Sequence, residues 1–171
     1  LFEHAFKISR MQYFMCSVQS AEPTEEALKE FNEGIARRAN REPLQHILGT
    51  QEFMGLEFFV NRHTLIPRQD TETLVELVLA DHKEKDIKLL DMCTGSGCIG
   101  IAIASRVKDA KVTLADISQE ALTVAKENVT LNKLSGRVRC VRANALEPAN
   151  AFLGKFDMIV SNPPYITGAD M

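Results

Sequence analysis

The run Asn162-Pro163-Pro164-Tyr165, near the end of the 171-residue chain, carries groups that could hold a planar nitrogen. The nitrogen of an amide or exocyclic amine is a poor nucleophile because its lone pair is delocalised. The Asn162 side-chain oxygen and the Pro163 carbonyl can accept its two hydrogens and turn the lone pair towards an electrophile. The two prolines stiffen that carbonyl, and Tyr165 offers a flat face. We predict that Asn162, Pro163 and Tyr165 are catalytic and that Pro164 helps to bind substrate. The alternative is a plain strand-ending turn.

A glycine-rich segment, residues 91–100, has the pattern of a nucleotide-binding turn. Gly95 and Gly97 let the backbone turn tightly and approach a ligand, and the next helix presents free N–H groups to it. Read literally, Gly95, Gly97 and Gly100 match the dinucleotide fingerprint. This signal is weak by itself, and a simple turn before a helix fits equally well.

Polar residues after the strands that follow fit an adenosine. Asp116 lies 19 residues after Gly97, where a carboxylate can accept both ribose hydroxyls; the alternative is a helix N-cap. Asn144 falls where an adenine contact is expected, or it is a turn residue. NAD and S-adenosylmethionine both fit so far. Asp91 favours S-adenosylmethionine, whose sulfonium and ammonium groups attract an acid, whereas a pyrophosphate would be repelled. The predicted cofactor-binding residues are Asp91, Thr94, Gly95, Gly97, Asp116, Asn144 and Asn162.

The elements that must position these residues alternate between strand and helix. Apolar runs predict strands over residues 87–91, 111–116, 138–142 and 156–161. Residues 95–104 are predicted to form a Gly-rich turn that enters a helix, and a second helix is predicted from Ser118, as N-cap, to about Asn132. Such alternation implies right-handed crossovers, with the carboxyl ends of the strands at one edge of the sheet. The predicted fold class is therefore α/β, with a doubly wound, mostly parallel sheet.

Two smaller parts precede this sheet. Apolar residues at helical spacing predict a helical domain over residues 1–41, with a second helix opening near Pro23-Thr24. Residues 42–70 are interpreted as a linker with a β-hairpin in the aromatic stretch 51–60. The third domain, 71–171, opens with a helix capped by Asp70 or Thr71. The chain ends six residues after Tyr165, and four strands make a thin sheet, so we expect this domain to continue beyond the sequence.

Composition favours a soluble globular protein, with 45% hydrophobic residues, 25% charged residues and a formal net charge of −3. The acidic balance argues against many phosphate contacts, and the basic stretch 37–41 fits a solvated helix end. Four scattered cysteines indicate free thiols in a reducing compartment and no metal site. No apolar run is long enough to span a membrane. We expect a cytoplasmic monomer, with an organelle matrix as the alternative, and no stable binding to nucleic acid or membrane.

Residues 91–97, Asp116 and 162–165 resemble class I methyltransferases that modify amino groups, which include adenine-N6 DNA methyltransferases and protein-glutamine methyltransferases. Residues 41–49, 53–56 and 65–72 are similar to the signature of the HemK/PrmC release-factor glutamine methyltransferases. The resemblance implies methylation, by S-adenosylmethionine, of the glutamine in the Gly-Gly-Gln (GGQ) motif of peptide chain release factors. It implies that the N-terminal helical domain docks the release factor. It also implies that the loop holding Arg68 borders the donor site, where Arg68 binds substrate or instead pairs with Glu72.

Two residues depart from the family pattern: Cys93 replaces the first glycine of the loop, and Asn144 stands where an acid is expected. Three other functions remain as alternatives. An adenine-N6 methyltransferase on DNA or RNA would use the same chemistry but predicts a basic groove. A dinucleotide oxidoreductase leaves residues 162–165 unexplained. A non-catalytic fragment that binds release factors is compatible with the early end of the chain.

Overall fold

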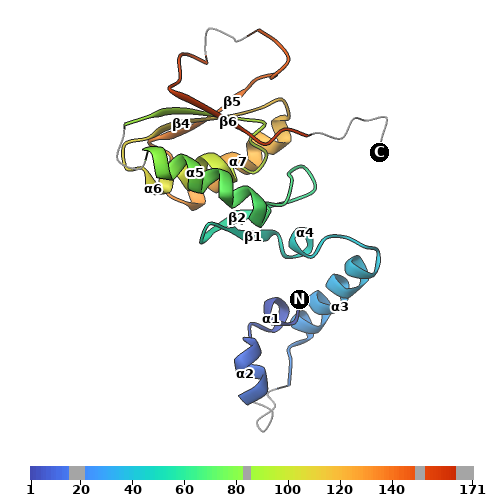
Figure 1. Cartoon of the computed structure of the whole chain (residues 1–171). Coiled ribbons are helices and arrows are strands. Elements are labelled where there is room, and N and C mark those ends of the chain that lie inside the picture. The colour runs from blue at the N-terminus through green and yellow to red at the C-terminus, as the bar shows by residue number, and fades with distance from the viewer. Residues whose placement is uncertain (16–21, 83–85, 149–152, 165–171) are drawn as a thin grey trace. The chain divides into compact units, whose positions relative to one another are not determined.

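The computed structural model describes residues 1–15, 22–82, 86–148 and 153–164 (Figure 1). The chain divides into two compact units, Leu1–Gly49 and Thr50–Met171. This division falls after Gly49, whereas the sequence predicts a first boundary after residue 41. No helix among the described residues is long and apolar enough to cross a membrane.

The described part of the N-terminal unit is helical. Its elements are α1 (Phe2–Phe6), α2 (Arg10–Met15), α3 (Glu25–Ala39) and α4 (Leu44–Leu48). Lys7 adopts a left-handed conformation, with φ of 53°, and ends α1 before α2 begins. Thr24 caps α3 through its side chain, as the sequence around Pro23-Thr24 predicts. Rings of Phe2 and Phe6 lie 6.4 and 5.3 Å from the ring of Phe31, which packs α1 against α3.

The second unit is built on a parallel sheet with the strand order β5-β4-β3-β6. Its strands are β3 (Lys88–Met92), β4 (Lys111–Asp116), β5 (Val138–Arg142) and β6 (Met158–Ser161). Following the chain, β4 lies next to β3 and β5 lies next to β4, whereas β6 pairs with the other side of β3. The reversal makes a switch point between β3 and β6, where open α/β sheets bind ligands. The predicted fold class is confirmed.

Three helices cover one face of this sheet: α5 (Glu72–His82), α6 (Cys98–Arg106) and α7 (Gln119–Leu131) (Figure 1). The main core lies between them and the sheet, where Leu89, Ile101 and Leu114 are fully buried. The described parts of the connection from β5 to β6 include Leu153 and Phe156, which pack with Leu90 on the opposite face, as right-handed crossovers require. A smaller apolar cluster, which includes Leu90 and Leu153, lies on that face.

A β-hairpin opens the second unit, as predicted from the aromatic stretch. Strands β1 (Thr50–Phe53) and β2 (Leu56–Phe59) pair antiparallel around a turn at Met54-Gly55, both with positive φ. Phe53 and Phe58 are buried in the main core, with ring centroids 6.2 Å apart. The hairpin is therefore packed into the same core as the sheet and its helices.

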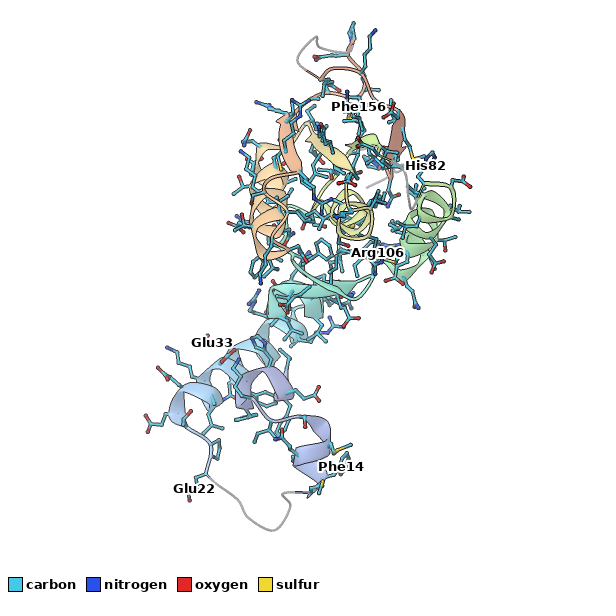
Figure 2. All side chains as sticks on the ribbon, turned by 90° about the vertical axis from the view of Figure 1, so that its left-hand side faces the viewer. Phe14, Glu22, Glu33, His82, Arg106 and Phe156 are labelled. Atoms are coloured by element: carbon cyan, nitrogen blue, oxygen red, sulfur yellow. The ribbon has the colours of Figure 1, made fainter. Side chains whose placement is uncertain are left out.

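The turn of the hairpin is also held by hydrogen bonds to two helices. The Met54 N–H donates to Glu72 Oε1 at 2.7 Å, at the start of α5. The Met54 carbonyl accepts from the guanidinium of Arg106, at the end of α6 (Figure 2). A 3-10 turn, η1 (Gln69–Thr71), precedes α5, which begins at Glu72, directly after Thr71.

Gly100 allows α6 to lie directly against the sheet, and this contact gives a test of the packing. A Cβ at Gly100 would lie 2.4 Å from Leu114 Cδ2 and 3.2 Å from Asp91 Cβ. We expect Gly100→Ala to lower the free energy of unfolding by about 1–2 kcal/mol, because overpacking exceeds the gain in helix propensity. Urea denaturation measures the change. Gly136→Ala is the matched control, since open space surrounds Gly136. Equal stability of the two variants would contradict this packing.

Candidate functional site

Predicted site residues from all four strand ends lie at the carboxyl edge of the parallel sheet, whereas Arg68 lies in the loop before α5. Asp91 lies near the end of β3, Asp116 ends β4, Asn144 follows β5 and Asn162 follows β6. These residues are far apart in sequence, and the parallel pairing of the strands brings them to one edge.

The pairing of β6 with β3 fixes where the Asn-Pro-Pro segment begins. Met92 is opposite Ser161 in the parallel register, so Asn162 follows alongside Cys93, where the glycine loop starts. The Ser161 hydroxyl donates to the Met92 carbonyl at 2.7 Å and ties the two strand ends together. Asn162 is half-buried, and Pro163 and Pro164 are exposed. Tyr165 lies outside the described residues.

The glycine loop between β3 and α6 turns through three left-handed residues: Cys93, Gly95 and Gly97, with φ of 59°, 56° and 83°. Gly97 is the N-cap of α6, and a Cβ there would lie 2.9 Å from Leu114. A Cβ on Gly95 would meet nothing within 4 Å, so this part of the loop borders open space that a ligand can occupy. The backbone of Cys93 has a left-handed conformation, which glycine adopts without strain. This conformation explains why the family pattern has glycine at this position.

Asp91 is fully buried and fastens this loop to the strand. Its Oδ2 accepts from the Thr94 hydroxyl at 2.6 Å and from the Gly100 N–H at 3.0 Å. Its Oδ1 has no hydrogen-bond partner within the described part of the chain. Burial raises the pKa of Asp91 to about 6; the charge of Asp116 adds to the rise, and the bonds from Thr94 and Gly100 oppose it.

Asp116 holds the other side of the loop. Its Oδ2 accepts from the Gly95 N–H at 2.9 Å, and its Oδ1 accepts from the Ser118 N–H at 3.0 Å. The N-cap of α7 is Ser118, as predicted, because its side chain accepts from the Ala121 N–H. Asp116 is therefore not the cap of that helix. Each of its oxygens keeps acceptor capacity for a hydroxyl group.

Asn144 takes part in a turn after β5. Its side-chain oxygen accepts from the Leu146 N–H, and its side-chain nitrogen donates to Glu147, both at 3.0 Å. These bonds fit the turn role, while a contact with adenine stays a prediction.

A cavity of about 580 Å³ opens beside Asn144 and extends over the sheet face opposite the helices. Its lining includes Met92, Ile117, Asn144, Leu153, Phe156 and Ile159. One end of the cavity thus reaches the carboxyl edge, next to Asp116.

Arg68 is exposed and makes no ion pair with Glu72 among the described contacts. The Glu72 carboxylate instead accepts from the Met54 N–H. The expected alternative, in which Arg68 pins the loop through Glu72, is therefore not seen, and the Arg68 guanidinium is accessible from solvent.

Asn128, in the middle of α7, is the residue that sequence reasoning missed. It is fully buried and bonds both to β2 and to the glycine loop. A polar residue at a buried position of the helical repeat was the only available signal. No cluster of His, Cys, Asp or Glu suited to a metal ion occurs among the residues that the structure describes.

Two family models match the chain: the methyltransferase small domain over residues 69–171 and the PrmC N-terminal domain over residues 1–49. The chain belongs to the HemK/PrmC family. The family predicted from the motifs is thus confirmed, and the boundary after Gly49 in the structure coincides with the end of the PrmC N-terminal match.

Curated HemK/PrmC relatives named release factor glutamine methyltransferase are similar to the chain. The protein of Clostridium botulinum is 42% identical over 143 residues, which cover 83% of this chain and 50% of the relative. The protein of Clostridium acetobutylicum is 39% identical over 95% of this chain and 57% of its own length. The protein of Chlorobaculum tepidum is 37% identical over 99% and 60%, respectively. The chain thus spans between half and three fifths of these relatives.

Solved structures agree on the fold. A Pyrococcus abyssi tRNA (uracil-54, C5)-methyltransferase, in complex with S-adenosyl-L-homocysteine, is similar with a TM-score of 0.53 and 22% identity. The match covers 67% of this chain and 28% of that protein. An Agrobacterium tumefaciens SAM-dependent methyltransferase gives a TM-score of 0.53 at 21% identity, over 67% of this chain and 39% of that one.

The raised pKa of Asp91 predicts a pH-dependent stability. A carboxyl group whose pKa rises on folding contributes stability at low pH that is lost as the pH rises through about 6. The Asp91→Asn variant lacks this titration. We expect the unfolding free energy of the wild type, relative to that variant, to fall by on the order of 1 kcal/mol from pH 5 to pH 8. Urea denaturation at each pH measures it.

Asp109→Asn, at an exposed position, is the control for losing one carboxylate. A difference between wild type and Asp91→Asn that does not change with pH would contradict the assignment of a pKa near 6 to this group.

Proposed function

We propose that this chain binds S-adenosylmethionine and orients the side-chain amide of a glutamine for methyl transfer, the glutamine being that of the GGQ motif of peptide chain release factors. The observation that carries the proposal is the position of Asn162, which follows β6 alongside the start of the glycine loop. A nitrogen held by Asn162 would lie next to a donor held by that loop. Proximity of this kind is a large part of what such a reaction requires.

The residues around the loop fit the donor. Gly95 borders open space, and the Asp116 oxygens can still accept the ribose hydroxyls. The buried Asp91 carboxylate places negative charge near the region where the cationic methionine end would lie. The cavity that reaches Ile117 and Asn144 offers room for the adenine. When bound, S-adenosylmethionine supplies an electrophilic methyl group.

The Asn-Pro-Pro segment is suited to the acceptor. The Asn162 side-chain oxygen and the Pro163 carbonyl accept the two amide hydrogens, which directs the nitrogen lone pair towards the donor. The predicted stacking face, Tyr165, lies outside the described residues. Arg68 is accessible and is proposed to contact the substrate from the loop before α5.

The names of the curated relatives support a release factor as substrate. The formal net charge of −3 gives no support to DNA or RNA. We assign release-factor docking to the N-terminal helical domain. The cytoplasmic location, the monomeric state and the absence of stable nucleic-acid binding stay predictions.

A methyl-transfer assay tests the proposal. The chain is incubated with labelled S-adenosylmethionine and, separately, with a release factor, the same factor lacking the GGQ glutamine, and duplex DNA. We expect label only in the intact release factor. Label in DNA alone would favour the adenine-N6 alternative. Label in none of them would contradict the proposed activity for this chain.

The Asn162→Ala variant distinguishes orientation of the substrate amide from binding of the methyl donor. Loss of one acceptor should lower methyl transfer by about 100-fold or more, because the lone pair is no longer oriented. Binding of S-adenosylhomocysteine, measured by calorimetry, should remain. A variant that transfers methyl groups normally, or that no longer binds S-adenosylhomocysteine, would show that the role of Asn162 is misassigned.

A further inference from the structure

Asn128 connects three segments of the second unit through one buried amide. Its Oδ1 accepts from the Phe59 N–H at 2.6 Å, and its Nδ2 donates to the Phe59 carbonyl at 3.0 Å. The same Nδ2 donates to the Ser96 carbonyl at 2.9 Å. Asn128 thus joins α7 to the last residue of β2 and to the middle of the glycine loop.

We propose that Asn128 is a positioning residue for the methyl donor: it fixes the Ser96 peptide and so holds the glycine loop in the shape that binds S-adenosylmethionine. The inference rests on the proposed function of that loop. Asn128 is placed to act through Ser96, without itself contacting the donor.

The loop needs an anchor at this point because both neighbours of Ser96 are glycines in left-handed conformations. Glycine has the largest backbone freedom of all residues, so two of them make the segment adaptable. The N–H of Gly95, the residue before Ser96, donates a hydrogen bond to Asp116. The carbonyl of Ser96 itself accepts a hydrogen bond from Asn128. Fixing both groups before the ligand arrives reduces the ordering cost of binding.

Few other groups could replace the Asn128 amide as the hydrogen-bond partner of the Ser96 carbonyl. Asn128 is fully buried, and both hydrogens of its amide nitrogen are used, one for Ser96 and one for Phe59. If the amide is removed, the carbonyl of Ser96 loses its partner in a buried environment, where an unpaired polar group is unfavourable. The loop is then expected to shift towards other conformations, which weakens donor binding.

Asn132, the C-cap of α7, provides a matched control one turn after Asn128. Asn132 also bonds to the hairpin, through its Nδ2 and the Glu57 carbonyl at 3.1 Å. Among its described bonds none reaches the glycine loop. Asn132→Ala therefore removes a hydrogen bond to the hairpin and leaves the hydrogen bond from Asn128 to Ser96 intact.

The test compares wild type, Asn128→Ala, Asn128→Asp and Asn132→Ala in the full 171-residue chain. Calorimetry gives the dissociation constant for S-adenosylhomocysteine, well below the melting temperature of each variant. Amide hydrogen exchange reports on Gly95 and Gly97. Asn128→Asp keeps the size of the side chain and the acceptor for the Phe59 N–H but can make at most one of the two donations, and that one only when protonated, so it is the second variant if Asn128→Ala does not fold.

We expect both Asn128 variants to bind S-adenosylhomocysteine about tenfold more weakly, with faster exchange in the loop. Asn132→Ala should bind as the wild type does, even if its melting temperature falls. Equal affinity of the Asn128 and Asn132 variants, with a wild type that binds, would overturn the positioning role and leave the proposed function standing. A wild type that binds no S-adenosylhomocysteine would overturn the proposed function and this inference with it.

Discussion

The buried carboxylate of Asp91 is the interaction on which the rest of the site depends. Through one oxygen it joins the end of β3 to Thr94 in the glycine loop and to Gly100 in the first turn of α6. Strand β3 pairs with both β4 and β6. The junction of β3 with the glycine loop, which Asp91 holds, therefore lies between Asp116 at the end of β4 and Asn162 after β6. A buried acid with a raised pKa costs stability near neutral pH. Its presence there is easier to understand if it serves a cationic ligand.

The hairpin is the second constraint on the loop. It is held at its turn by Glu72 and Arg106 and at its end by Asn128, while its two phenylalanines fill the main core. A segment that sequence patterning assigns to a linker is in this way built into the second unit. The glycine loop, α7 and the hairpin share the Asn128 amide, whose hydrogen bond to Phe59 joins residues 69 positions apart in sequence.

The features that sequence predicted are those with local causes. Strands β4 and β5 and the Ser118 cap follow from apolar runs and from the side chain of one residue. The features it missed depend on tertiary contacts or on unusual backbone. Helix α4 is short, Lys7 ends α1 through a left-handed conformation, and Asn128 has partners that only the fold brings near. The bonds of Asp116 to Gly95 and Ser118 are likewise invisible before the strands are paired.

The central claim is that the carboxyl edge of the sheet, around the glycine loop, binds the methyl donor. Titration of the isotope-labelled chain with S-adenosylhomocysteine, followed by amide NMR shifts, tests it most directly. The account predicts that the largest shifts occur at Gly95, Ser96, Gly97 and Ile117, with little change at Gly136, near the amino end of β5. No shift at these amides at saturating ligand, or shifts confined to the N-terminal unit, would contradict it.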